Sequence, residues 1–253
     1  MHKVSGIILS ILTLFLFSCS EKNQFPEKKS VKLSLTAVKA DQPILKNVVT
    51  VPDSLASQSL NDELQQLKKF IGKYENRDPD FSLETMESLW ETVNTKSDVA
   101  GLERVSAWIE TSGFLLEITG KPKYAAALQQ LTTEKNIGLN ESDTKTAGQR
   151  LMPYIFTKDV DHIFVNIFVN SSVEYDHSLG GKIKVTQELT GSNSLLLKFS
   201  TTEKRYIEVH ILIPEEAQNA TVTEKNVKYV ATPGEYCLIA RKWKEGDMVE
   251  IKY

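Results

Sequence analysis

The sequence predicts an α+β protein in which a short region of helical hairpins precedes an antiparallel β-sandwich. From about residue 55 to residue 150, apolar residues recur every three or four positions, which is the period of an amphipathic helix. From about Leu151 onward the period changes to two, and glycine and proline turns separate short runs, which is typical of a sandwich. We therefore expect helices over residues 55–150 and the sandwich over residues 151–253.

The N-terminal residues have the pattern of a bacterial lipoprotein signal. A short basic start precedes an apolar run from Val4 to Phe17, which is shorter than the roughly 20 residues that a spanning helix needs and suits a signal peptide. The run ends in the residues LFSC, which resemble a lipobox with Cys19 as the acylated residue. We expect a signal peptide over residues 1–19, lipid attachment at Cys19, and a body anchored outside the cytoplasm in the bacterial cell envelope, at the periplasm or cell surface. An ordinary signal peptide with an incidental cysteine is the alternative.

Four helices are expected after a polar tether over residues 20–54, which includes a short strand near Val31–Val38. The first carries an apolar face with Leu60, Leu64, Leu67, Ile71 and Tyr74. Ser82 is a plausible N-cap for the second. The third runs from about Ala100 to Thr119 with Gly120 as its C-cap, and Pro122 suits the first turn of the fourth. Residues 136–148 are polar and are predicted to be irregular.

Short strands with turns between them are expected in the C-terminal part. Apolar residues alternate over residues 163–169, and further runs lie at 182–188, 195–200, 206–213, 220–224, 235–243 and 248–252. Gly180-Gly181, Pro233-Gly234 and Glu245-Gly246-Asp247 are turn signals between them.

Charge and cysteine usage exclude several classes of function. The net charge is −3 and the lysines and arginines are dispersed, so the chain lacks the basic footprint of a nucleic-acid-binding protein. Cys237 is the only cysteine beyond Cys19; it has no disulfide partner once Cys19 is acylated, and we interpret it as a small buried hydrophobe. The four histidines, His2, His162, His177 and His210, show no metal-ligand spacing such as HExxH. We expect no metal and no cofactor.

Two segments resemble a known family. The first is Trp108 to Ala125, with the run FLLEITGKPKYA; the second comprises IPE at 213–215, PGEY at 233–236 and RKWKEGD at 241–247. Together they resemble the β-L-arabinofuranosidases of glycoside hydrolase family 127, which are six-hairpin glycosidases. Tyr154-Ile155-Phe156 looks like that family's crossover between its two domains. The resemblance covers roughly residues 88–253 and implies part of an α/α toroid followed by a β-sandwich.

The resemblance also implies a zinc-bound cysteine nucleophile, which this sequence lacks. Glu103 matches the glutamate of the family's Glu-x-Cys pair, but Val105 stands in place of the thiol, and residues 137–143 hold no cysteine where a pair is expected. Glu103 is the only weak catalytic candidate. Glu103, Glu110 and Glu117 recur at sevens along one helix face, so they cannot face each other across a sugar. Trp90, Trp108 and Trp243 are interpreted as core residues rather than sugar platforms.

We therefore expect a lipid-anchored, non-catalytic relative of family 127, a pseudoenzyme that serves as a carbohydrate-associated or interaction module. The membrane is one expected partner and an oligosaccharide is a candidate ligand; no protein partner is indicated. An active glycoside hydrolase with a divergent site is one alternative, and a structural envelope lipoprotein is the other.

Overall fold

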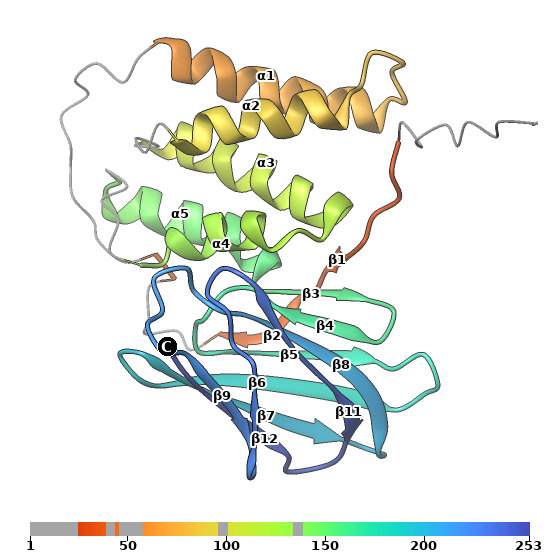
Figure 1. Cartoon of the computed structure of the whole chain (residues 1–253). Coiled ribbons are helices and arrows are strands. Elements are labelled where there is room, and N and C mark those ends of the chain that lie inside the picture. Colours follow the sequence, from red (N-terminus) through yellow and green to blue (C-terminus); the bar gives the residue numbers. More distant parts are fainter. Residues whose placement is uncertain (1–24, 39–43, 46–57, 96–100, 134–138) are drawn as a thin grey trace, which may run out of the picture.

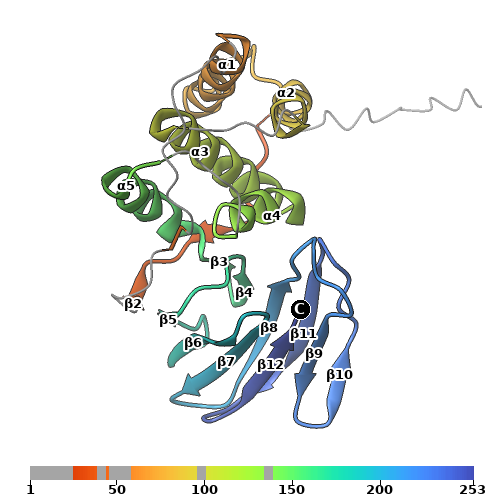
Figure 2. The ribbon, with the colours of Figure 1, turned by 90° about the vertical axis from the view of Figure 1, so that its left-hand side faces the viewer.

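A computed structural model describes residues 25–38, 44–45, 58–95, 101–133 and 139–253. The expected signal peptide and the expected lipid attachment site Cys19 lie outside these residues. A group of helices lies at one end of a two-sheet sandwich (Figure 1), and the view turned by 90° shows the same stacking (Figure 2). The predicted α+β architecture is confirmed.

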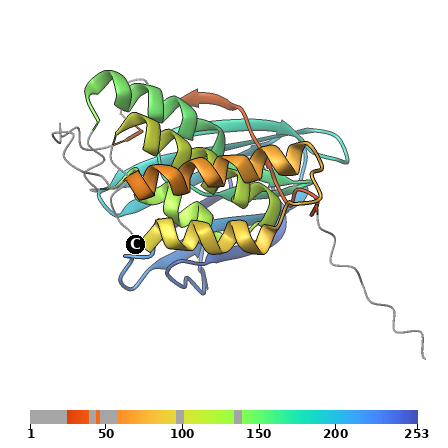
Figure 3. The same cartoon turned by 90° about the horizontal axis from the view of Figure 1, so that it is seen from above.

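The described residues form five helices, with α3 at their centre. They are α1 (Gln58–Glu75), α2 (Leu83–Thr95), α3 (Leu102–Thr119), α4 (Pro122–Gln130) and α5 (Glu141–Leu151). Helix α3 contacts the other four, and α1 and α2 lie side by side above it (orange and yellow in Figure 3). Because α3 is surrounded, it is buried almost throughout from Val105 to Ile118.

The predicted helix ends are present. Ser82 accepts the backbone N–H of Thr85 at 3.2 Å, as an N-cap does. Gly120 adopts the left-handed conformation, with φ of 66°, and donates its N–H to the carbonyl of Leu116. Pro122 is the first residue of α4, where its missing N–H leaves no hydrogen bond unmade.

Helix α5 corrects the prediction that residues 136–148 are irregular. Asn140 caps the helix by accepting the backbone N–H of Asp143 at 2.8 Å. The buried face consists of Thr144, Ala147, Gly148 and Leu151. Most of these side chains are small or polar, so the face has no apolar stripe in the sequence although it packs against α3.

The sandwich consists of a five-stranded sheet in the order β1-β3-β4-β8-β11 and a seven-stranded sheet in the order β10-β9-β12-β7-β6-β5-β2. The strands are β1 (Val31–Lys32), β2 (Leu35–Val38), β3 (Phe156–Asp159), β4 (His162–Val165), β5 (Ser171–Asp176), β6 (Lys182–Gly191), β7 (Ser194–Thr201), β8 (Arg205–Leu212), β9 (Thr221–Glu224), β10 (Val227–Tyr229), β11 (Tyr236–Trp243) and β12 (Met248–Lys252). A short 3₁₀ turn, η1 (Met152–Tyr154), leads into β3.

The predicted antiparallel sandwich is confirmed, and its one parallel pair among the described strands is β4 with β8. One strand prediction needs correction. The alternating run over residues 163–169 forms a strand only to Val165, and the chain then bends before β5 begins at Ser171.

The N-terminal segment is part of the fold. The short strand expected near Val31–Val38 is present as β1 and β2, which pair with β3 and β5 in different sheets. Glu117 in α3 anchors this segment: its buried carboxylate pairs with Lys28 Nζ at 2.5 Å and Lys32 Nζ at 3.0 Å. Its backbone carbonyl accepts the N–H groups of Lys29 and Ser30. Residues 25–38, expected to be tether, therefore connect helices and sheets.

The core of the sandwich contains the expected residues. Trp243 is fully buried and stacks on Phe199 with 3.9 Å between ring centroids. Cys237 is buried near the other end of β11. No helix in the described part of the chain is long and apolar enough to cross a membrane.

A buried carboxylate stabilises the last turn. Asp247, which follows Gly246 in the predicted turn, pairs with Arg241 and Lys225 at 3.2 Å each and accepts the backbone N–H of Lys244 at 3.1 Å. Burial acts to raise the pKa of Asp247, but the backbone N–H and the two cations outweigh it and hold the pKa below its usual range.

Candidate functional site

The three glutamates of α3 lie in different environments. Glu103 is exposed in the first turn of the helix. Glu110 is exposed seven residues further along the helix and pairs with Lys68 of α1 at 3.5 Å. Glu117 is buried against the N-terminal segment. The structure therefore does not bring these carboxylates together at one site.

The positions that would hold zinc do not fit the family's cysteine centre. Val105 is fully buried in the core of the helical region. Within the described residues, Cys237 is the one free cysteine, and it lies inside the sandwich. Burial raises the pKa of the Cys237 thiol to about 11, which disfavours the thiolate that a nucleophile or a metal ligand requires. We derive no chemistry through a thiolate-bound metal.

The tryptophans belong to the core, as expected. Trp90 and Trp108 stack with 4.9 Å between ring centroids, and the indole N–H of Trp90 donates to Ser112 Oγ at 2.9 Å. The indole N–H of Trp243 donates to the carbonyl of Ile207 at 3.0 Å. All three rings are buried, so none can stack against a sugar.

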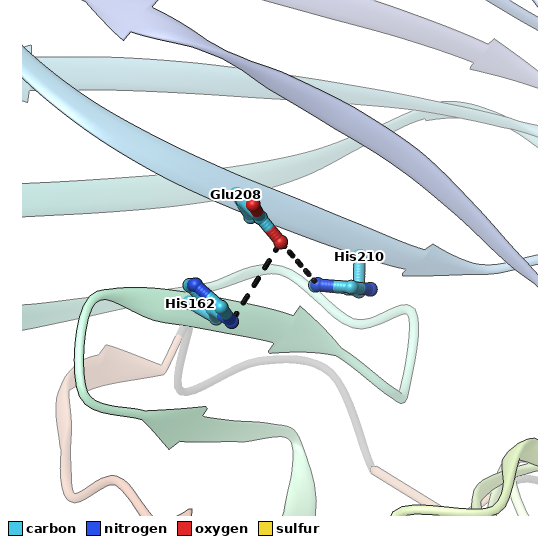
Figure 4. Close-up of side chains that lie close together, drawn as sticks. All are labelled: His162, Glu208 and His210. Carbon is cyan, nitrogen blue, oxygen red and sulfur yellow. Dashed lines mark ion pairs between the residues drawn. The ribbon is translucent and has the colours of Figure 1, made fainter.

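A group of potential metal ligands lies instead on the five-stranded sheet. His162 of β4 and Glu208 and His210 of β8 place their side chains together (Figure 4). Glu208 Oε2 lies 3.7 Å from His162 Nδ1 and 3.6 Å from His210 Nε2. All three ligand atoms lie within 4.8 Å of one another. We call these three residues the His-Glu-His cluster.

Sequence spacing along one element could not reveal this cluster. Glu208 and His210 are two residues apart in one strand, so both face the same side of the sheet. His162 joins them from a strand far away in the sequence, because β4 pairs with β8. The alternation of Glu208 and His210 with buried Val209 was the only signal in the sequence.

The surroundings of the cluster hold it in place. The His210 ring stacks on Phe164 at 4.4 Å between centroids with 19° between planes. The Tyr206 hydroxyl donates to Glu208 Oε1 at 3.2 Å. Burial lowers the pKa of His210 and the neighbouring His162 lowers it further, although Glu208 opposes the shift. The His210 imidazole is therefore neutral at neutral pH.

The described residues also form a hollow at the turn between β6 and β7. It is shallow and lined by turn residues such as Ser192, Asn193 and Asn219, together with Tyr253. Lys252 and Tyr253 are the titratable residues of its lining.

Comparison with solved structures shows which known proteins share this fold. The chain is similar to a solved glycoside hydrolase, with a TM-score of 0.51 and 15% identity over 60% of this chain and 32% of that one. Two other structures have TM-scores of 0.48. One is a GH127 β-L-arabinofuranosidase from Geobacillus stearothermophilus T6, which is 20% identical over 58% of this chain and 30% of that one. The other is a GH127 β-arabinofuranosidase, which is 16% identical over 60% of this chain and 31% of that one. The chain thus spans about a third of the length of these structures. No curated protein matches it.

The sandwich matches a known family model. Residues 162–253 match the model of the middle domain of GH127 β-L-arabinofuranosidases. The resemblance to family 127 inferred from the sequence motifs is confirmed for this sandwich region, which is the part of the chain that the family model matches. The match includes all three residues of the His-Glu-His cluster.

Proposed function

We propose that this protein is a lipid-anchored, non-catalytic relative of the family 127 glycoside hydrolases, held outside the cytoplasm at the bacterial cell envelope. It serves as a carbohydrate-associated or interaction module. One observation carries the proposal: buried Val105 stands where the resemblance places the thiol, and Cys237 is buried inside the sandwich. A cysteine mechanism has no nucleophile among these residues.

The carboxylates support the same proposal. Glycosidases that use two carboxylates hold them roughly 5 to 9.5 Å apart on either side of the scissile bond. Glu103 lies in solvent, Glu110 pairs with a lysine and Glu117 is buried in an ion-pair cluster. Since α3 rises about 1.5 Å per residue, neighbours in this series are separated along the helix rather than across a cleft.

The outer face of the five-stranded sheet supports a role in carbohydrate association. Tyr206 of β8 and Leu238 of β11 are each about half exposed, and Leu238 lies beside His210 across the strand pair. The exposed tyrosine ring offers a surface on which a sugar ring can rest, because aromatic faces combine apolar area with a polar tip. Leu238 adds apolar area further along the same face of the sheet. The LFSC sequence supports the lipid anchor.

The test combines binding and turnover on the full chain with Cys19→Ser, which removes the expected acylation site. We expect calorimetry to detect binding of arabinose- or galactose-containing oligosaccharides, and no release of sugar from an aryl β-L-arabinofuranoside. Leu238→Ala should weaken binding, whereas Val227→Ala, equally exposed on the other sheet, should not.

The other outcomes identify the alternatives. Hydrolysis above the rate without protein would establish an active glycosidase with a divergent site and refute the non-catalytic proposal. Neither binding nor hydrolysis would refute the carbohydrate role and favour a structural envelope lipoprotein.

A further inference from the structure

We propose that the His-Glu-His cluster is a binding site for a divalent transition-metal cation, with Zn²⁺ as the representative ion. The ligands are His162 Nδ1, Glu208 Oε2 and His210 Nε2. This inference does not depend on the proposed function, because the cluster lies in the sandwich and uses none of the positions discussed for glycosidase chemistry. Within the described residues, it is the one group of three such side chains close enough to share an ion.

The backbone places all three ligands on one face. Strands β4 and β8 pair with Ile163 beside Val209 and Phe164 beside His210, which sets His162 next to Glu208. Ile163 and Val209 are fully buried between the sheets. Since side chains alternate along a strand, the residues on either side of them must face outward. The sheet therefore fixes the relative positions of the three ligands before any ion binds.

The distances suit one shared ion better than hydrogen bonds. The separations of 3.7 and 3.6 Å between Glu208 Oε2 and the two imidazole nitrogens exceed hydrogen-bond length. Tetrahedral zinc with bonds of about 2.0–2.1 Å separates its ligand atoms by roughly 3.3 Å. Both nitrogens converge on the same carboxylate oxygen (Figure 4). His162, whose side chain is 41% exposed, is free to make the small rotation that closes the site.

Neighbouring groups orient the ligands. The Tyr206 hydroxyl occupies Glu208 Oε1, which leaves Oε2 turned toward the histidines. Phe164 stacks on the His210 ring and fixes its plane. Supporting contacts of this kind are typical of metal sites, where they set the direction of each ligand.

His210 Nε2 gives an independent reason for a bound ion. This atom is buried and makes no hydrogen bond within the described part of the chain. A buried polar atom without a partner destabilises the fold, and a metal bond to the imidazole nitrogen would satisfy it.

The donor set selects the class of metal. Two imidazole nitrogens and one carboxylate suit zinc and other first-row transition metals, whereas calcium and magnesium prefer oxygen ligands alone. Three protein ligands leave at least one coordination position open. Because the cluster is only partly buried, that position faces solvent and can take water or an oxygen atom of a bound molecule.

Calorimetric titration with ZnCl₂ tests the proposal. The protein is the full chain with Cys19→Ser, purified with a histidine-free tag and treated with a chelator. We expect one Zn²⁺ per chain, and an affinity at least about tenfold weaker in His210→Ala and in Glu208→Gln. Tyr206→Phe, which removes only the supporting hydroxyl, should weaken binding by roughly tenfold. Glu250→Gln, an exposed carboxylate on β12, is the matched control and should bind like the parent.

Two further measurements keep the result interpretable. Circular dichroism and thermal unfolding without metal verify that each variant folds. The visible spectrum of the Co²⁺ form should show coordination bands without a thiolate charge-transfer band, because Cys237 is not a ligand. Failure of the parent to bind Zn²⁺ stoichiometrically, or unchanged affinity in both His210→Ala and Glu208→Gln, would overturn the proposal. Sugar binding measured in chelator reports on the proposed function separately.

Discussion

The contact between Gly113 and Tyr154 permits a sharp test of how the helices join the sandwich. Gly113 lies in the middle of α3, and Tyr154 lies in η1, just before the first strand of the C-terminal part. A Cβ atom at position 113 would lie 2.1 Å from Tyr154 Cζ and 2.5 Å from its hydroxyl oxygen. Tyr154 is buried, so its ring has little room to retreat. We predict that Gly113→Ala destabilises the protein.

The magnitude follows from two opposing effects. Overpacking a buried contact costs about 1–3 kcal/mol, and a 2.1 Å approach belongs at the upper end, near about 3 kcal/mol. Alanine in a helix interior is about 1 kcal/mol more favourable than glycine. The net loss of unfolding free energy should be about 2 kcal/mol. In a Tyr154→Leu background the clashing ring atoms are absent, so the same substitution should stabilise by about 1 kcal/mol.

A double-mutant cycle by urea unfolding measures this coupling. The expected interaction energy between Gly113→Ala and Tyr154→Leu is about 3 kcal/mol, the difference between a loss of about 2 and a gain of about 1. Gly72→Ala in α1, where a Cβ meets no atom within 4 Å, is the control and should stabilise in both backgrounds. If the two substitutions change the free energy of unfolding additively, or if Gly113→Ala stabilises the protein, then α3 does not pack against Tyr154 in this way.

Three further predictions follow from the same structure and sequence. Cys19→Ser should abolish incorporation of labelled fatty acid and move the protein out of the membrane fraction; retention of label would show that another residue is acylated. Asp247→Asn should lower the free energy of unfolding at pH 7. Because the pKa of Asp247 is depressed in the native protein, its carboxylate stabilises the fold above the unfolded pKa of about 3.9, and this stabilisation is lost as the pH falls through the native pKa. A difference in unfolding free energy between Asp247→Asn and the parent that persists undiminished at pH ~2 would contradict the ion-pair explanation. The double substitution Lys28→Met and Lys32→Met should lower the free energy of unfolding by about 3 kcal/mol, since it leaves the buried carboxylate of Glu117 unpaired. Glu117→Gln should lower it less, because the two lysines that lose their partner are nearly half exposed. The opposite order in urea unfolding would refute this asymmetry.

The parts of the fold that can be predicted from the sequence are those in which large apolar side chains are buried. Trp90 and Trp108 lie on apolar stripes in the sequence, and they stack in the helical core. Helix α5 was missed because its buried face is made of small residues such as Ala147 and Gly148. Strand β5 was missed for a related reason: it begins with Ser171 and Ser172, which are polar but buried. Sequence patterning reports side-chain chemistry, and it fails where close packing rather than hydrophobicity places a residue inside.

The His-Glu-His cluster shows the same limit for a site. Two of its three residues could be found from the sequence. Ile207, Val209 and Ile211 form one apolar side of a strand, so Glu208 and His210 must share the other side. The third ligand could not be predicted from the sequence. His162 lies next to the other two because β4 pairs in parallel with β8, and three strands of the opposite sheet lie between β4 and β8 along the chain. Helical motifs such as HExxH carry their own geometry within one element, whereas a site on a sheet depends on which strands are neighbours. A pair of alternating ligand-type residues on an otherwise apolar strand is therefore the signal to look for, and the fold must supply the partner.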